Sequence, residues 1–311
     1  MEENSTMLPS NSKKNETNRP IFILGVPRSG TTLLSFILDS HPNIAIGRET
    51  LVMQSIHHFV GDWAKDRDVL VYKDWYLRYG VSRDQLTVYV RNFLNNFFDD
   101  YASQQGKKRW GDKTPRHTYY CNLIYEIFPN AQFIHIVRDP RAVCYSRKLW
   151  NDPVEGIARE WEEQNESVKL FGERVGEKQY RRITYEDLVQ NPKPTIVELL
   201  SFLNEDWHDN LLRHHEVSPN KYIYQHDPKV SDGWHERVVE GKAVVEGGND
   251  PKQAINTDSV EKWQKKLRKI EVLKIQEVTE KGMKDFGYKR AHGLIPLIGS
   301  IKLEKDRTKN Q

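Results

Sequence analysis

The sequence predicts an α/β domain in which a central parallel sheet lies between layers of helices. Two stretches carry this prediction, residues 21–24 (IFIL) and 133–137 (FIHIV). Each is a short apolar run rich in β-branched residues, which is typical of a parallel strand buried on both faces. A turn and the start of a helix follow each run. Strands that alternate with helices in this way form three-layer domains, and 311 residues suffice for one large domain or two small ones.

The turn after the first strand occupies residues 26–30. Pro27 fixes one backbone φ angle there, and Gly30 permits a close approach of the backbone to a ligand. Apolar residues then recur at helical spacing, at Leu33, Leu34, Ile37 and Leu38. The backbone N–H groups that begin such a helix, with the hydroxyls of Thr31 and Thr32 beside them, form a site for phosphate or another oxyanion.

This loop is close to a Walker A motif, GxxxxGK[ST], and departs from it at one position. Gly25, Gly30 and Thr32 match the motif, whereas Thr31 replaces its lysine. The nearby cation is Arg28, inside the loop, and its planar guanidinium suits an oxyanion held by two hydrogen bonds. We therefore predict a P-loop-like domain that holds a terminal phosphate or sulfate.

The string PRSGTT after a buried strand resembles the 5′-phosphosulfate loop of sulfotransferases that use 3′-phosphoadenosine 5′-phosphosulfate (PAPS). It is the arginine form, similar to the loop of tyrosylprotein, carbohydrate and many bacterial sulfotransferases. Further motifs follow in the family's order across residues 21–288. The resemblance implies that PAPS binds at the carboxyl ends of the strands without a metal ion. The loop residues implied to contact it are Arg28, Ser29, Gly30, Thr31 and Thr32.

Glu49 is the next candidate. In the arginine-type sulfotransferases an HP turn precedes a Gly-x-Glu-Thr sequence whose glutamate is the proposed base, and residues 41–42 and 47–50 reproduce that order. The resemblance therefore assigns the base to Glu49, which agrees with the need to remove a proton from an attacking hydroxyl. The competing interpretation is that Glu49 favours the N-terminus of a helix predicted over 51–63.

Lys113 lies in the sequence WGDKTP, which resembles the DKTP element of the family. There a lysine would place its ammonium near the transferred sulfuryl group and the bridging oxygen, where negative charge develops. With Glu49 and Arg28, Lys113 completes the predicted catalytic set. The competing interpretation is a solvated surface lysine, since lysine is usually exposed.

Arg138 follows the strand at 133–137, at the end where ligands of open α/β sheets bind. The string VRDPRAVCYS resembles the family's 3′-phosphate element, in which an arginine and a serine eight positions later grip the phosphate. Arg138 and Ser146 have that spacing. The resemblance therefore implies that these two side chains bind the 3′-phosphate of PAPS.

Three further residues are implied to contact the cofactor. Tyr185 begins the sequence YEDLVQNP, which resembles a family element whose tyrosine contacts the cofactor, although this tyrosine could equally pack in the core. Ser259 and Lys262 lie in a segment that resembles the one returning a serine and a basic residue to the phosphates. The irregular region 214–256 before it corresponds to a loop over cofactor and acceptor, and a lid is the predicted role.

The remaining elements follow from hydrophobic periodicity. Ser82 is a predicted N-cap, followed by a helix at 82–101 whose apolar face we interpret as core. The other predicted elements are helices at 117–128, 155–174, 192–203 and 261–286, and a strand at 181–184. Residues 1–18 should be disordered, 19–293 should form the sulfotransferase domain, and 294–311 should be a C-terminal extension that docks on it.

Composition limits the partners and the compartment. The net charge is +3, which does not indicate a nucleic-acid partner. No apolar run approaches the ~20 residues that span a bilayer, and no signal-peptide pattern is present. The two cysteines, Cys121 and Cys144, are not in CxxC spacing, which indicates a reducing compartment. We therefore expect a cytoplasmic protein without a transmembrane segment, and a homodimer stays open.

The expected reaction is transfer of a sulfuryl group from PAPS to a hydroxyl or amine. Tyrosylprotein sulfotransferases carry a basic residue just after the Glu-Thr pair, where this chain has Leu51. A carbohydrate, lipid or small-metabolite acceptor is therefore ranked above protein tyrosine. The sequence also leaves open a P-loop nucleotide or small-molecule kinase and a non-catalytic nucleotide-binding protein. A kinase should show a lysine at 31 and an acidic metal site.

Overall fold

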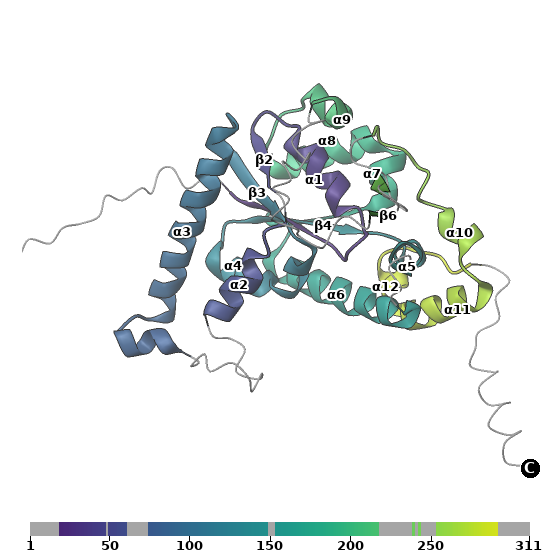
Figure 1. Cartoon of the computed structure of the whole chain (residues 1–311), viewed down its shortest axis with the longest axis horizontal. Helices are drawn as coiled ribbons and strands as arrows, with labels where there is room; N and C mark the ends of the chain where they lie inside the picture. The colour runs from purple at the N-terminus through teal and green to yellow at the C-terminus, as the bar shows by residue number, and fades with distance from the viewer. Residues whose placement is uncertain are drawn as a thin grey trace, which may run out of the picture.

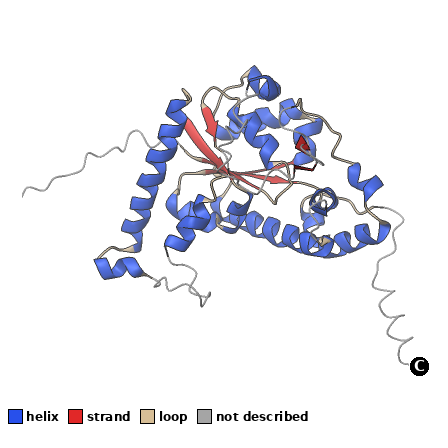
Figure 2. Cartoon of the chain, in the orientation of Figure 1, coloured by secondary structure: helices blue, strands red, loops and turns tan. Residues whose placement is uncertain are grey.

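The computed structural model describes residues 19–47, 49–60, 74–148, 153–217 and 253–291, with the backbone of two short strands, β6 (Val238–Val239) and β7 (Lys242–Ala243). The predicted α/β fold is confirmed, because a parallel sheet lies in the middle of the molecule with helices on both sides (Figures 1 and 2). The predicted tails at 1–18 and 294–311, and most of the predicted loop at 214–256, lie outside the described residues.

Five parallel strands form the sheet, in the order β2-β3-β1-β4-β5. Their bounds are β1 (Ile21–Leu24), β2 (Ile44–Ile46), β3 (Arg109–Lys113), β4 (Gln132–Val137) and β5 (Tyr180–Thr184). Because β1 lies between β3 and β4, the loops that follow these three strands leave the sheet side by side at its carboxyl edge. Ligands of open α/β sheets bind at this edge.

Helices surround the sheet and connect its strands. Their bounds are α1 (Thr31–Asp39), α2 (Val52–Phe59), α3 (Arg83–Gln104), α4 (Cys121–Ile127), α5 (Pro140–Lys148), α6 (Val154–Val175), α7 (Tyr185–Gln190), α8 (Pro192–Leu203), α9 (His214–Val217), α10 (Lys262–Lys266), α11 (Lys269–Val278) and α12 (Glu280–Asp285), with 3-10 turns η1 (Trp75–Tyr79), η2 (Pro115–Tyr119) and η3 (Asp209–Arg213). In Figure 1, α1, α7 and α8 lie on one side of the sheet, whereas α2, α4 and α6 lie on the other.

Two predicted helices are broken in the structure. The one predicted at 117–128 consists of η2 and α4, separated at Tyr120, whose φ of −119° is not helical. The one predicted at 261–286 consists of α10, α11 and α12. Leu267 and Arg268 are extended there, and α11 starts anew where the backbone N–H of Arg268 donates to Glu271 Oε2 at 2.9 Å.

The N-cap predicted at Ser82 is confirmed, because its hydroxyl accepts from the backbone N–H of Gln85 and Gln85 bonds back to the Ser82 N–H. The apolar face predicted for this helix is only half buried. Its buried part is Leu86, Val90, Leu94 and Phe98, whereas Tyr89, Phe93 and Phe97 are 58–64% exposed. The prediction that this whole face is core is therefore wrong, because its seven apolar positions span more of the circumference than α3 presents to the sheet.

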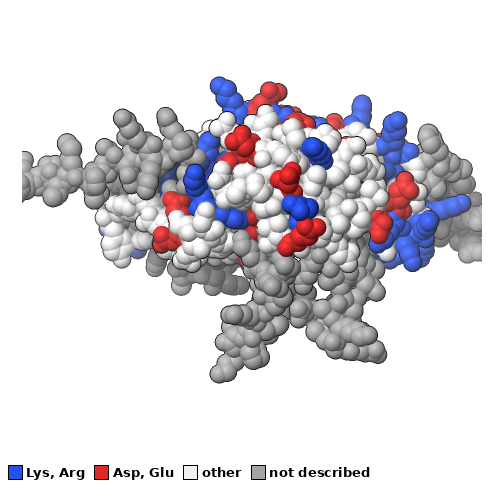
Figure 3. Space-filling model, turned by 90° about the horizontal axis from the view of Figure 1, so that it is seen from above, with Lys and Arg blue, Asp and Glu red and all other residues white. Residues whose placement is uncertain are grey.

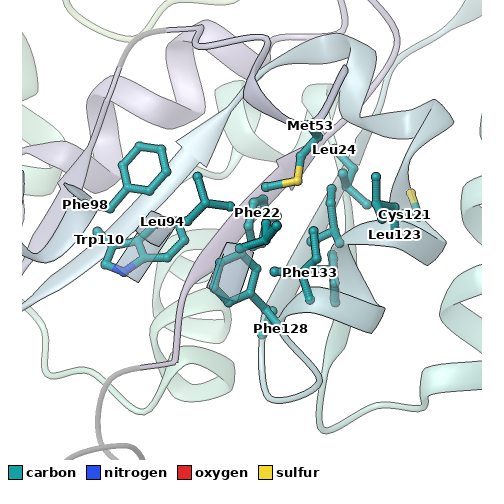
Figure 4. Packing of buried hydrophobic residues seen from close by; sticks show 14 of the residues in the cluster. Phe22, Leu24, Met53, Leu94, Phe98, Trp110, Cys121, Leu123, Phe128 and Phe133 are labelled. Atoms are coloured by element: carbon teal, nitrogen blue, oxygen red, sulfur yellow. The ribbon is translucent and has the colours of Figure 1, made fainter. Parts of the chain in front are cut away.

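The two faces of β1 enter two different cores. Phe22 and Leu24 pack with α3 and α4, while Ile21 and Ile23 pack with α1 and α8, as the side-chain alternation of a strand requires. Figure 4 shows the first core, where the Trp110 ring stacks on Phe98 at a centroid distance of 4.5 Å. Covering both faces holds the central strand rigidly, and the loops at its carboxyl end with it.

Charge is distributed without one dominant sign. In the view of Figure 3 basic and acidic side chains are intermixed on the visible face. Many of the described charges form pairs between elements, such as Lys169 with Asp285 at 2.6 Å and Arg83 with Glu126 at 2.6 Å. This distribution agrees with the small net charge of +3.

Candidate functional site

The loop between β1 and α1 has an unusual backbone. Arg28 has φ of 75° and Gly30 has φ of 96°, both in the left-handed region. A non-glycine residue there is uncommon and costs about 1 kcal/mol. The Ser29 N–H closes a turn on the Val26 carbonyl at 3.0 Å, and α1 begins at Thr31. The first N–H groups of α1 therefore face the loop without helical acceptors, as an anion site requires.

The predicted phosphate-binding side chains lie together at this loop. Arg28 Nε donates to Ser146 Oγ at 2.8 Å, and Arg138 Nη1 donates to the Arg28 carbonyl at 2.9 Å. Arg138 and Ser146 thus adjoin Arg28 from two elements, the end of β4 and the last turn of α5. Arg28 carries its charge beside a second guanidinium. Burial lowers the pKa of Arg28, and the nearby Arg138 lowers it further.

Two more predicted residues complete this group. The Arg138 guanidinium stacks on the Tyr185 ring at 4.3 Å from the centroid and donates from Nη2 to the Ser259 carbonyl at 2.7 Å. The Tyr185 hydroxyl bonds to Ser259 Oγ at 2.5 Å. We call Arg28, Arg138, Ser146, Tyr185 and Ser259 the arginine cluster. Lys262 is exposed on the first turn of α10, and no described contact joins it to the cluster.

Two polar atoms at this place are buried without a hydrogen-bond partner among the described residues. They are Ser29 Oγ, in the loop, and Arg138 Nε, in the arginine cluster. Ser29 is 0% exposed and Arg138 is 3% exposed, so bulk water does not compensate them. Unpaired buried donors are rare in folded proteins and cost about 1–3 kcal/mol each. The acceptor oxygens of an anion are partners of the kind that both atoms lack.

A second group lies at the start of α1. Lys113 Nζ donates to Glu49 Oε1 at 2.6 Å and to Thr32 Oγ1 at 3.3 Å. The Lys113 side chain is 7% exposed, which excludes a solvated surface lysine, whereas the Glu49 side chain is 30% exposed. We call Thr32, Glu49 and Lys113 the lysine–glutamate cluster. It combines a buried cation, a hydroxyl and an accessible carboxylate at a helix N-terminus.

The sheet order explains why these residues meet. Lys113 ends β3, beside Ile23 of β1 in the parallel register, so its side chain reaches the loop after β1. Glu49 follows β2, which pairs with β3 at Ile46 and Gly111. Since α2 begins at Val52 with Leu51 at its N-cap, Glu49 lies outside the helix. Its described partner is Lys113.

Sequence reasoning missed a buried network next to this cluster. Asp112 Oδ2 accepts from the Thr50 hydroxyl at 2.6 Å and lies 3.1 Å from His117 Nε2, while Asp112 Oδ1 accepts from the Thr114 hydroxyl at 3.1 Å. Burial raises the pKa of Asp112, but His117 and the two hydroxyl donors outweigh it, so the pKa is below its ordinary value. The aspartate of the DKTP sequence was the available signal, because a carboxylate that the fold buries needs partners.

More than half of the chain resembles a known family. A sequence model of the sulfotransferase family matches residues 20–209. The chain belongs to the sulfotransferase family. This confirms the resemblance inferred from PRSGTT and the expected class of enzyme, one that transfers sulfate, and it favours this class over a kinase.

The curated relatives include protein-tyrosine sulfotransferase A of Caenorhabditis elegans, 30% identical over 231 residues, which are 68% of this chain and 57% of the relative. Human protein-tyrosine sulfotransferase 1 is 31% identical over 215 residues, 63% of this chain and 54% of the relative. The chain thus spans little more than half the length of these relatives. Their names support protein tyrosine as the acceptor better than the carbohydrate, lipid or metabolite ranked first.

Solved structures agree on the fold. The sulfotransferase domain of the Synechococcus PCC 7002 olefin synthase gives a TM-score of 0.54 at 23% identity and covers 89% of this chain and 98% of that domain. The sulfotransferase domain from the curacin biosynthetic pathway gives 0.56 at 19% identity and covers 88% and 99%. At these identities the likeness shows a shared P-loop-like α/β fold.

The predicted cytoplasmic location is wrong, because the relatives are protein-tyrosine sulfotransferases, a class of Golgi membrane enzymes. The prediction rested on the two cysteines and on the lack of a long apolar run or a signal-peptide pattern, and none of these features identifies the compartment. Among the described helices none is long and apolar enough to cross a membrane. In the same part of the chain, no group of three or more His, Cys, Asp or Glu side chains could hold a metal ion.

Proposed function

We propose that this chain transfers the sulfuryl group of PAPS to the phenolic hydroxyl of a tyrosine in a protein or peptide. The observation that carries the proposal is the meeting of the arginine cluster and the lysine–glutamate cluster at the two sides of one loop, before the N-terminus of α1. One cluster is rich in cations and the other holds an accessible carboxylate. A transferase of this kind needs both, one to bind phosphates and one to handle the acceptor proton.

The described residues fit PAPS. Arg138 and Ser146 are the proposed ligands of the 3′-phosphate, and the loop at 28–32 holds the 5′-phosphosulfate. The buried Arg138 and the half-buried Arg28 guanidiniums repel each other, and an anion between or beside them offsets that repulsion. The unpaired Ser29 Oγ and Arg138 Nε support the same assignment, since each offers a donor to a phosphate oxygen. Tyr185 and Ser259 hold Arg138 in place.

Bound PAPS supplies a sulfuryl group on a good leaving phosphate. Glu49 then accepts the proton of the phenol as the phenolic oxygen bonds to sulfur and the bond from sulfur to the bridging oxygen breaks. The leaving phosphate keeps that electron pair. Lys113, the Thr32 hydroxyl and the first N–H groups of α1 stabilise the charge that develops there. Arg28 acts with the arginine cluster on the departing bisphosphate.

The choice of tyrosine rests on the relatives, whose printed names are protein-tyrosine sulfotransferases. Leu51, 42% exposed, stands where those enzymes carry a basic residue and was the reason to prefer other acceptors. A single side chain at the edge of the site affects how tightly the residues flanking the acceptor bind. It has less effect on which hydroxyl reacts. We therefore assign the acceptor hydroxyl to tyrosine and leave its neighbours in the acceptor open.

Incubation with labelled PAPS and four acceptors tests the proposal. The acceptors are a tyrosine peptide, the same peptide with phenylalanine or serine at that position, and a monosaccharide. We expect label on the tyrosine peptide alone, with release of adenosine 3′,5′-bisphosphate and an unchanged rate in EDTA. Label on the sugar or serine would overturn the acceptor, and no transfer from PAPS to any acceptor would overturn the function.

A further inference from the structure

Two consecutive loop residues pair with two consecutive strand residues beside the candidate site. Glu49 Oε1 lies 2.6 Å from Lys113 Nζ, and the Thr50 hydroxyl donates to Asp112 Oδ2 at 2.6 Å. The Thr50 N–H also donates to Thr114 Oγ1 at 3.2 Å. Because neighbouring side chains of a strand point to opposite faces, Lys113 and Asp112 hold the loop from both sides of β3.

The Asp112 side of this arrangement is the more rigid one. Asp112 is 1% exposed, and His117 and Thr114, which also contact its carboxylate, are each 1% exposed. Two hydroxyls thus donate to the buried carboxylate, one to each oxygen, and His117 Nε2 lies 3.1 Å from Oδ2, which fixes both oxygens. Thr50 itself is exposed, so the contact joins an exposed loop residue to a fixed point in the core.

The backbone around Thr50 needs such a bond. Leu51, the next residue, has φ of 53°, which is strained for a non-glycine side chain. The Thr50 hydroxyl also accepts from the Val52 N–H at 3.1 Å, at the start of α2. The bond to Asp112 therefore determines where the chain turns between Glu49 and α2.

We propose that Asp112 is a positioning residue for the transfer, which acts through Thr50 to hold the Glu49 carboxylate where the acceptor hydroxyl is deprotonated. This rests on the proposed function of Glu49 as the base. The ion pair of Glu49 with Lys113 cannot do this alone, because it weakens once the carboxylate takes up a proton. The Thr50–Asp112 bond involves no reacting proton and persists through the reaction.

Thr50 offers a matched pair of variants. Thr50→Val keeps the size and removes the hydroxyl that donates to Asp112, whereas Thr50→Ser keeps that hydroxyl, and neither changes the packing of the apolar core because Thr50 is exposed. The rate is measured on a tyrosine peptide and on the same peptide with 3-nitrotyrosine, whose more acidic phenol is already partly ionised and needs less base. PAPS affinity is measured by calorimetry on the same preparations.

We expect Thr50→Val to lower kcat on the tyrosine peptide by about 10- to 100-fold, to lower it much less on the nitrotyrosine peptide, and to leave PAPS affinity unchanged. Thr50→Ser should remain close to the wild type on both. Equal losses on the two peptides would show a general structural effect and overturn the proposal. Wild-type kcat for Thr50→Val would overturn it as well.

A wild-type enzyme that sulfates neither peptide would defeat the proposed function, and amide hydrogen exchange then tests the positioning separately. The amides of Thr50 and Val52 should exchange faster in Thr50→Val than in the wild type and Thr50→Ser. Equal exchange in all three proteins would mean that the Thr50–Asp112 bond does not order the loop.

Discussion

The ring of Tyr185 lies directly on Gly30. A Cβ atom added to Gly30 would come within 2.4 Å of Tyr185 Cδ2, closer than real contacts allow, and Gly30 has φ of 96°. The same ring stacks on Arg138 at 4.3 Å. The loop before α1 and the arginine cluster are therefore packed as one unit, in which any side chain at 30 would displace the residue that supports Arg138.

Gly30→Ala should lower the affinity for adenosine 3′,5′-bisphosphate by about tenfold or more, because the methyl group displaces Tyr185 and with it Arg138. Gly176→Ala is the matched control. Gly176 also has a left-handed φ, 80°, but a Cβ there meets nothing within 4 Å. The control should lose stability and keep its affinity. Calorimetry that finds the same affinity in both variants would rule out the coupling.

The sequence predicts those strands of the sheet that are continuous apolar runs, and it does not predict β2 or β3. The two strands with continuous apolar runs, β1 and β4, are evident from sequence. β2 has three residues, and β3 contains an arginine, a glycine, an aspartate and a lysine, so neither has a strand pattern. Asp112 and Lys113 can lie in an interior strand because the neighbouring loop supplies Thr50 and Glu49 as partners, and such tertiary compensation cannot be read from local sequence.

The candidate site follows a similar division. The residues that belong to recognisable sequence motifs, such as PRSGTT and VRDPRAVCYS, come together in the structure. The partners that hold them do not appear in the strings: Ser259 reaches Arg138 through its carbonyl oxygen, and any residue type offers that group. The bond from Arg28 to Ser146 joins two residues that belong to different motifs, and neither motif indicates it.

The 3′-phosphate assignment predicts a strong preference for adenosine 3′,5′-bisphosphate over adenosine 5′-phosphate. Without its phosphate the cationic pocket stays unpaired, at a cost of about 2–5 kcal/mol. Arg138→Lys should narrow the preference, since lysine keeps the charge but loses the planar fork. The control is Arg181→Lys, at a surface arginine paired with Glu198. Equal wild-type affinities for the two nucleotides in calorimetry would contradict the assignment.

Lys113 is assigned to the charge that develops during transfer. Lys113→Ala should lower kcat by ~10²–10³, while PAPS affinity changes much less. Lys265→Ala, at an exposed position of α10, serves as the control and should leave both unchanged. Steady-state kinetics with nearly normal kcat for Lys113→Ala would remove the residue from the mechanism.

Folding stability should depend on pH through His135. This side chain is buried in β4, between Tyr180 Oη at 2.7 Å and Asn165 Oδ1 at 2.9 Å. Burial lowers the pKa of His135 to about 4, although its bond to Asn165 favours the proton. Because the pKa of His135 is lower in the folded protein, the unfolded chain binds this proton at a higher pH than the folded protein does. Stability from this group is therefore present above about pH 6.5 and lost as pH falls toward 4.

Urea unfolding at several pH values measures this effect. Between pH 6.5 and 4.5 the wild type should lose about 2–3 kcal/mol through His135. His135→Gln cannot titrate, so its free energy of unfolding should be lower at pH 7 and fall less over this interval. Parallel curves for the two proteins would show that His135 does not carry the dependence.

A comparison of the wild type with Glu49→Gln tests the role of Glu49 as the general base. Glu49→Gln keeps the size of the side chain but cannot accept the proton, and its rate on the tyrosine peptide is measured beside its melting temperature and PAPS affinity. If Glu49 is the base, the variant should fold, bind PAPS and lose ~10²–10⁴-fold in rate on the tyrosine peptide, with a smaller loss on the nitrotyrosine peptide. Wild-type turnover of the tyrosine peptide by a stable, PAPS-binding Glu49→Gln enzyme would contradict it.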